Sequence, residues 1–164
     1  SHGIALEGLR LVNENLEQAC EQPDDLTARS NMMAAAMMGA VGFQKGLGAV
    51  HALSHPIGAI YNTHHGTTNA VLIPAVLRLN APAIAPTMER VSAYLGIAGG
   101  FEGFGARVDE LNRALNIPAT LGALGLSDPD LDLIIKGALI DPSCGGNPIP
   151  LDASNLRGVL EASL

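Results

Sequence analysis

Apolar residues recur at helical spacing along most of the chain, without the alternation typical of β-strands. In residues 4–18, Leu9, Val12 and Leu16 lie on one side of a helix and Glu7 on the other. The pattern predicts about seven helices, over residues 4–18, 26–53, 66–79, 83–95, 104–116, 127–139 and 152–163. We therefore predict an all-α fold, a bundle of these helices that forms a single helical domain over residues 1–164.

The longest predicted helix, residues 26–53, contains the segment NMMAAAMMGAVGF, which is apolar around most of its circumference. A helix that is apolar on all sides is usually buried at the centre of a protein, and we expect this one to be. The glycines at 46 and 48 predict a kink or break, and Pro56 predicts the helix end. We expect a loop over residues 57–63 and a connection between helices at residues 80–82.

Proline also bears on the next predicted helix, because Pro74 lies inside residues 66–79 and is expected to kink or shorten it. The pair Asp128-Pro129 marks the start of the helix over residues 127–139. Asp152 is a candidate N-cap for the last helix.

Composition supports helix packing and excludes one class of function. Of 164 residues, 48% are apolar and only 15% are charged, so a covered surface, by another domain or by a partner chain as in a homodimer, is compatible with the sequence. The net charge is −7 and no Lys/Arg cluster occurs, which argues against nucleic-acid binding.

Cysteine usage and hydropathy point to a cytoplasmic protein. Cys20 and Cys144 lie far apart and show no CxxC spacing, so we expect neither a disulfide framework nor a cysteine zinc site. No run of eighteen apolar residues lacks a polar interruption, so we expect no membrane span. The first residues lack the basic and then apolar pattern of a signal peptide.

Histidine provides the strongest chemical signal, because His51, His55, His64 and His65 lie within fifteen residues. His51 and His55, four apart, share one face of a helix, a spacing that suits two ligands of one metal ion. Imidazoles favour Zn, Fe, Cu or Ni over Mg or Ca. The alternative is a set of hydrogen-bonded or surface histidines. No carboxylate lies between residues 41 and 88, so a local acid ligand is lacking.

Three segments together resemble a known family. Residues 48–58 (GAVHALSHPIG) and 65–70 (HGTTNA), with Leu72 and Pro74 after them, follow the pattern G-x-x-H-x-x-x-H-x-x-G, H-G-x-x-N-A and L-x-P. This pattern resembles the signature of the iron-containing (group III) alcohol dehydrogenases. Residues 141–150 (DPSCGGNPIP) are similar to that family's D-P-x-x-x-x-N-P-x-P.

The resemblance implies the C-terminal all-helical, metal-binding domain of the dehydroquinate synthase-like / iron-containing alcohol dehydrogenase fold. By motif, His51 and His65 would be two of four metal ligands, and His55 the pocket histidine that helps proton transfer. This replaces the pairing of His51 with His55 on one ion. His64 stands where many members have proline and receives no role. Phe43 is one residue short of the family's aromatic position and stays unassigned.

The resemblance also implies parts that these residues do not contain. The family's other two ligands, an aspartate and a histidine four residues later, would precede Gly3, as would an NAD(P)-binding α/β domain. No GxGxxG turn and no P-loop is present. The expected cofactors are a divalent metal, Fe(II) with Zn as the alternative, and NAD(P) in the full-length enzyme. Its substrate would be a small alcohol or aldehyde, and we expect the 164 residues alone to be inactive.

Two other function classes remain open. The chain could be a non-enzymatic helical or dimerising module derived from the family, and the start of the reading frame would distinguish this from an enzyme fragment. A zinc hydrolase is less favoured, because it needs a general-base carboxylate and none lies near the histidines in sequence.

Overall fold

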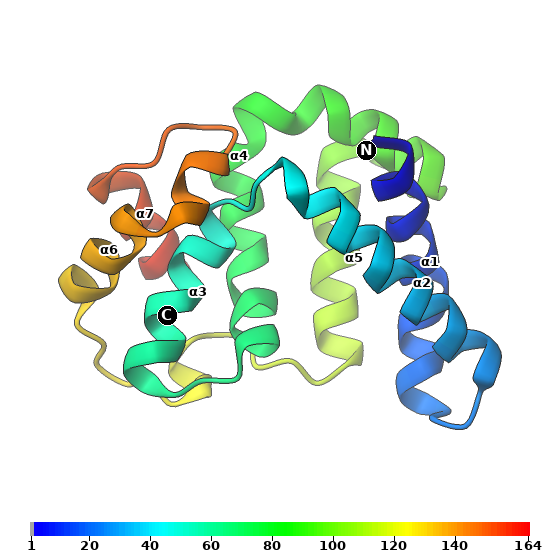
Figure 1. The fold of residues 1–164 in the computed structure, drawn as a ribbon, viewed down its shortest axis with the longest axis horizontal. Coiled ribbons are helices and arrows are strands. Elements are labelled where there is room, and N and C mark those ends of the chain that lie inside the picture. The colour runs from blue at the N-terminus through cyan, green and yellow to red at the C-terminus, as the bar shows by residue number, and fades with distance from the viewer. Residues whose placement is uncertain (1) are drawn as a thin grey trace. The chain divides into compact units, whose positions relative to one another are not determined.

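The computed structural model describes residues 2–164, which are mainly helical (Figure 1). Within these residues it contains seven α-helices, three short 3-10 helices and no strand, which confirms the predicted all-α class. The elements are α1 (His2–Glu21), α2 (Leu26–Gly42), η1 (Phe43–Lys45), α3 (Ala49–Tyr61), α4 (His65–Leu95), α5 (Gly100–Ala114), η2 (Gly122–Leu124), α6 (Leu131–Ile140), η3 (Pro142–Gly146) and α7 (Ala153–Glu161).

The helices group into two compact units, which are described separately. Unit 1 contains the chain up to Lys45 and Ala85–Arg107, and unit 2 contains Gly46–Ile84 and Val108–Leu164. The helices α4 and α5 each continue from one unit into the other. The single domain expected over residues 1–164 stays a prediction.

In unit 1, α1 packs beside α2 (Figure 1). The contact is close because small residues face it. A Cβ at Gly8 would lie 3.2 Å from the Cβ of Met38. The Asn31 amide donates to Asn15 Oδ1 at 2.9 Å across the pair. The predicted helix over residues 4–18 is thus confirmed, with α1 somewhat longer at both ends.

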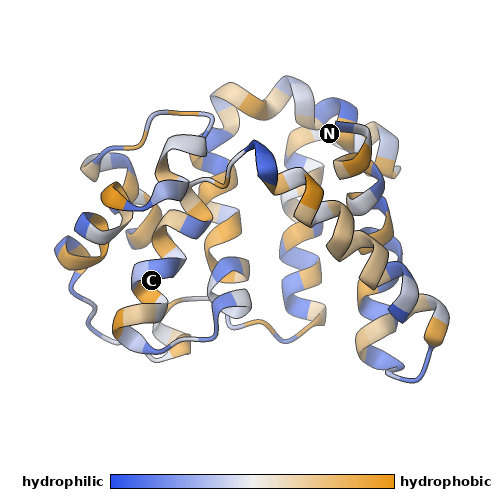
Figure 2. Ribbon diagram, in the orientation of Figure 1, coloured by the Kyte–Doolittle hydropathy of each residue, from blue (hydrophilic) through white to orange (hydrophobic). Residues whose placement is uncertain are grey.

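The prediction that the helix over residues 26–53 is central and buried is wrong for its apolar segment, residues 31–43. In α2 only the small side chains of Ala28 and Ala35 are buried among the described residues, whereas Met33 and Met37 are 69% and 70% exposed. Although much of the α2 ribbon is apolar (Figure 2), a single face of it has a neighbour in unit 1. Composition shows that a helix is apolar, but it does not show how many neighbours surround it.

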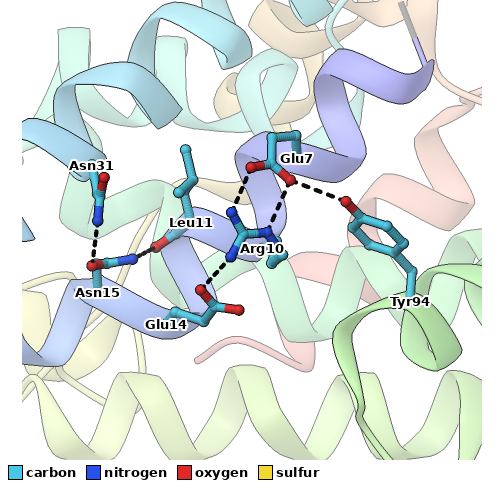
Figure 3. A network of polar contacts seen from close by, with 7 residues as sticks. All are labelled: Glu7, Arg10, Leu11, Glu14, Asn15, Asn31 and Tyr94. Carbon is cyan, nitrogen blue, oxygen red and sulfur yellow. Dashed lines mark hydrogen bonds and ion pairs between the residues drawn. The ribbon is translucent and has the colours of Figure 1, made fainter.

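A charged network in unit 1 joins α1 to α4 (Figure 3). Arg10 donates to Glu7 and to Glu14, and the Tyr94 hydroxyl donates to Glu7 Oε2 at 3.0 Å. The hydrogen bonds from Arg10 and then Tyr94 lower the pKa of the Glu7 carboxyl to about 2. The network orients the two helices. It adds little to stability, because these groups are exposed to water.

The core of unit 2 consists of aliphatic side chains from α3, α4, α6 and α7 and of Leu121 and Leu126, which flank η2. Its largest fully buried members are Leu53, Ile57, Leu72, Leu121, Ile134, Leu156 and Leu160. The helix α3 packs against α6 and η3, and α6 packs against α7. As composition predicts, this core uses Leu, Ile, Val and Ala rather than aromatic rings.

The prediction that Pro56 ends a helix is wrong. The break near residues 46–48 does occur, but α3 then runs through Pro56 to Tyr61, so residues 57–63 are not the predicted loop. The proline removes one helical hydrogen bond, and burial of the following turn offsets that loss, since Ile57 is fully buried. Helix α6 also approaches closely, because a Cβ at Gly137 would lie 2.8 Å from Pro56 Cβ.

The predicted connection at residues 80–82 is also wrong, because α4 is continuous from His65 to Leu95. Pro74 lacks the N–H that would bond to the carbonyl of Ala70. That carbonyl instead accepts a hydrogen bond from the Asn112 side chain of α5 at 2.9 Å. A side chain distant in sequence thus satisfies the helix where the proline leaves it incomplete.

Helix α4 also bears on membrane association. By length and composition it could span a membrane, and 28% of the relevant window is buried. A core helix of a globular domain passes the same test, and α4 contributes Val71, Leu72, Ala75 and Val76 to the unit 2 core. The predicted lack of a membrane span therefore stays a prediction.

At the other end of the chain, the start of α6 differs from the prediction and the start of α7 agrees with it. Helix α6 begins at Leu131 with Asp130 as its N-cap, four residues after the predicted start at residue 127. Asp152 caps α7 as predicted, in a reciprocal capping box with Asn155.

The side chain of Asn147 joins three segments of unit 2. Its Oδ1 accepts from the backbone N–H of Ala49, the first residue of α3, at 3.1 Å and from the Asn80 amide of α4 at 3.0 Å. Its Nδ2 donates to Asn80 Oδ1 and to the carbonyl of Ile149, each at 2.8 Å. Both atoms of this side chain are therefore used, and the start of α3 and the end of η3 are held together.

The backbone at this junction approaches so closely that position 146 requires glycine, and we predict the effect of replacing it. A Cβ at Gly146 would lie 1.9 Å from the carbonyl oxygen of Leu47, whereas one at Gly145 would meet nothing within 4 Å. Replacing Gly146 by Ala should lower the free energy of unfolding by about 1–3 kcal/mol, since backbone must move. Gly145→Ala should change it by less than about 0.5 kcal/mol. Urea denaturation measures both, and equal effects of the two variants would contradict the close approach.

Candidate metal centre

Three histidine side chains from two helices meet in unit 2. His51 and His55 lie one turn apart on α3, and His65 is the first residue of α4. The ring centroids are 5.7 Å apart for His51 and His55, 5.3 Å for His51 and His65, and 5.5 Å for His55 and His65. The structure thus brings together the three histidines to which the sequence analysis gives roles.

A short reversal of the chain places His65 opposite α3. Asn62 ends α3 in the left-handed region with φ of 54°, and its N–H bonds to the carbonyl of Gly58. Asparagine tolerates this conformation better than most residues. Only residues 63 and 64 separate Asn62 from His65, where α4 begins. The first turn of α4 therefore faces the side of α3 that carries His51 and His55.

Asn69 lies one turn after His65 and contacts two of the rings. Its Nδ2 is 3.1 Å from His65 Nε2 and 3.5 Å from His51 Nε2. An amide N–H can donate only to a ring nitrogen that has a free lone pair. The two Nε2 atoms therefore face the same small volume, and each presents a lone pair to it in the tautomer that carries hydrogen on Nδ1.

The other end of the Asn69 amide shows that this volume is incomplete. Its Oδ1 is buried and has no hydrogen-bond partner within residues 2–164. Such an orphaned polar atom in a native site calls for an ion, a water molecule or a further group. With two convergent imidazole nitrogens beside it, the site fits part of the ligand set of a borderline metal ion.

The environment keeps His51 available as a ligand. Burial lowers the pKa of His51 first, and the neighbouring His65 and His55 lower it further, while Asp141 acts in the opposite direction. A metal binds the neutral form of imidazole, so a lowered pKa favours ligation near neutral pH.

Asp141 is the functional neighbour that the sequence analysis did not assign. Its Oδ2 lies 2.8 Å from Nδ1 of His55, although the two residues are 86 positions apart. Its Oδ1 accepts from the backbone N–H of Ser143 at 2.8 Å. No acid lies near the histidines in sequence, so no local pattern points to Asp141. The D-P pair at residues 141 and 142 was the available signal, noted only as a similarity.

His64 has a structural role at the start of α4. Its Nδ1 accepts from the backbone N–H of Thr67 at 3.3 Å and contacts the Thr67 hydroxyl at 3.0 Å. Its carbonyl accepts the Thr68 N–H. It is therefore the N-cap residue of α4, a role the sequence analysis did not foresee.

The histidine cluster is suited to supply part of a metal site. Within residues 2–164, no three His, Cys, Asp or Glu side chains are placed to hold one ion together. His51 and His65, with Nε2 atoms facing one point, are suited to supply two ligands. A tetrahedral or higher site would need further ligands.

Comparisons with known proteins agree on one family. Residues 1–164 match the model of the Fe-containing alcohol dehydrogenase family, C-terminal. The chain is 40% identical to a 4-hydroxybutyrate dehydrogenase of Cupriavidus necator, over 99% of this chain and 44% of that protein. It is 34% identical to a 1,3-propanediol dehydrogenase of Klebsiella pneumoniae, over 88% and 39% respectively.

Among solved structures, a 1,3-propanediol oxidoreductase superposes with a TM-score of 0.93 and 29% identity. The superposition covers 99% of this chain and 44% of that one. The chain therefore spans less than half the length of these relatives.

The cap geometry of His64 predicts a stability effect separate from the other histidines. His64→Ala should lower the free energy of unfolding by roughly 0.5–2 kcal/mol, because the Thr67 N–H loses its acceptor. His64→Asn should retain most of the stability, since asparagine is a favourable N-cap. Thermal or urea unfolding of the two variants measures the difference, and equal destabilisation by both would exclude the capping role.

Proposed function

Because this chain belongs to the C-terminal part of the Fe-containing alcohol dehydrogenase family, we propose that it provides the metal-binding half of an NAD(P)-dependent alcohol dehydrogenase. The full-length enzyme would interconvert small alcohols with aldehydes or ketones by hydride transfer. The names of the relatives, which act on 4-hydroxybutyrate and 1,3-propanediol, support that substrate class. The observation that carries the proposal is the convergence of two Nε2 atoms on one point.

In this proposal His51 and His65 hold a divalent metal through Nε2, with Fe(II) the expected ion and Zn the alternative. The metal, when bound, supplies Lewis-acid polarisation of the alcohol or carbonyl oxygen, and NAD(P) supplies the hydride chemistry. Two imidazoles alone are a weak donor set, so the remaining ligands come from the part of the enzyme that the relatives possess outside the matched region.

His55 has a different task, because its ring is open to solvent. Its side chain is 41% exposed, and Asp141 already holds its Nδ1. It lies against His65, with nearly parallel rings 5.5 Å apart. A ring beside the metal ligands and open to solvent is suited to transfer the alcohol proton outward.

A non-enzymatic helical module is the second candidate. It is favoured by the low charge and by the exposed methionines of α2. A reading frame that begins just before Gly3 would support it, and one that continues upstream through a nucleotide-binding domain and an Asp-x-x-x-His would support the enzyme.

Metal retention tests the assignment of the ligands. In the full-length protein, His51→Ala and His65→Ala should each lower metal affinity by more than the roughly 10–100-fold that loss of an outer partner costs. His55→Ala should leave the metal content unchanged. His64→Ala is the matched control, because His64 directly precedes His65, and it should also leave the metal content unchanged. Elemental analysis after dialysis measures all four. Retention in the His51 or His65 variant would exclude that residue as a ligand.

The chain alone should show no turnover. Purified 164-residue protein, supplied with Fe(II), NAD and a short-chain alcohol, should form no NADH above a blank without protein, because two imidazoles hold the ion weakly. The absorbance of NADH measures this. Turnover that depends on the protein would show that residues 1–164 contain a sufficient site.

A further inference from the structure

The contact between His55 and Asp141 determines which ring nitrogen of His55 carries the proton. A carboxylate can only accept a hydrogen bond, so the 2.8 Å contact from Asp141 Oδ2 requires a proton on His55 Nδ1. In a neutral ring the lone pair then lies on Nε2, on the far side of the ring from Asp141. The partner of one ring nitrogen thereby determines the chemistry of the other.

Asp141 is itself held in place, so it can orient the ring instead of following it. Its side chain is only 13% exposed, and its second oxygen accepts from the Ser143 N–H at 2.8 Å. Its own backbone N–H bonds to the carbonyl of Ala138, a fully buried residue of α6. The carboxylate is therefore attached to the core of unit 2 through short backbone connections.

The charge state of Asp141 agrees with this role. Burial raises the pKa of the carboxyl, but hydrogen bonds from the Ser143 backbone and from His55 outweigh burial and leave the pKa below its ordinary value. The group is thus a carboxylate at neutral pH and acts as an acceptor. It comes from a distant part of the chain, whereas residues 42–87, which surround the histidines in sequence, contain no acid.

We propose that Asp141 is a positioning residue that holds His55 in the Nδ1–H tautomer and presents Nε2 as the proton acceptor of the site. The role of Nε2 in catalysis rests on the proposed dehydrogenase function, whereas the tautomer is a property of this chain alone. When Nε2 takes the hydroxyl proton of an alcohol, the ring becomes an imidazolium. The Asp141 carboxylate offsets that charge without taking up the proton, which then leaves Nε2 for solvent.

The variant Asp141→Asn separates positioning from folding. The asparagine oxygen can still accept the Ser143 N–H, so the turn into η3 keeps its cap. That N–H needs an acceptor, which leaves the amide nitrogen facing His55. The amide then donates to Nδ1, and the ring should change to the Nε2–H tautomer. Asp130→Asn is the matched control, because Asp130 caps α6 through Leu133 and does not contact His55 in the structure.

The test is the ¹⁵N spectrum of the imidazoles in the 164-residue chain, at a pH where they are neutral, with His55 assigned from its loss in His55→Gln. We expect Nδ1–H in the wild type and in Asp130→Asn, and Nε2–H in Asp141→Asn. An Nε2–H ring in the wild type, or the same tautomer in Asp141→Asn and wild type, would overturn the proposal. The wild-type spectrum is informative even if a variant fails to fold.

A second measurement distinguishes this proposal from the proposed function. In the full-length enzyme, Asp141→Asn should lower kcat by about 100-fold or more while metal content stays constant, and Asp141→Glu should restore part of the rate. A tautomer change with no change in kcat would support the positioning role and overturn proton transfer through His55. A lower kcat without a tautomer change would overturn the positioning role.

Discussion

The hydrogen bond from the Ala49 N–H to the Asn147 side chain is the interaction on which the histidine cluster depends. It anchors the first turn of α3, which carries His51 and His55. The same side chain pairs with Asn80 on α4, the helix that begins with His65. Asn147 also follows η3, which begins directly after Asp141. One side chain thus links the segments that supply the three histidines and Asp141.

Polar groups in this part of unit 2 are few, and their scarcity determines how the site works. A core of aliphatic side chains excludes water beneath α3, so burial lowers the pKa of His51 and leaves its lone pair free. In such surroundings a single carboxylate has a large influence on its neighbours, because there is little competing charge. Asp141, whose side chain is 13% exposed, is the carboxylate that contacts His55, whose side chain is 41% exposed.

Family membership and site geometry are the two observations that support the proposal of a half-site. The matched relatives are more than twice as long as this chain, and two convergent imidazoles do not complete a metal coordination shell. The Nδ2 of Asn69 contacts both rings, and its Oδ1 is buried with no partner within residues 2–164. When the ligands of a metal come from different parts of a protein, the metal affinity depends on how those parts come together. It then depends on more than the strength of each ligand alone.

The sequence by itself was sufficient for the helical class, which depends on short-range spacing. Spacing alone paired His51 with His55, and the resemblance of the motif to a family singled out His51, His55 and His65 together. Residues four apart share a helix face wherever the helix lies. Asp141, the Asn147 junction and the satisfaction of the Ala70 carbonyl by Asn112 depend on residues far apart in the chain, which no local pattern connects. The errors at Pro56, at residues 80–82 and along α2 have the same origin. Local cost predicted an end or a break, and local composition predicted burial, but the neighbouring helices decided each outcome because packing outweighs a single lost hydrogen bond.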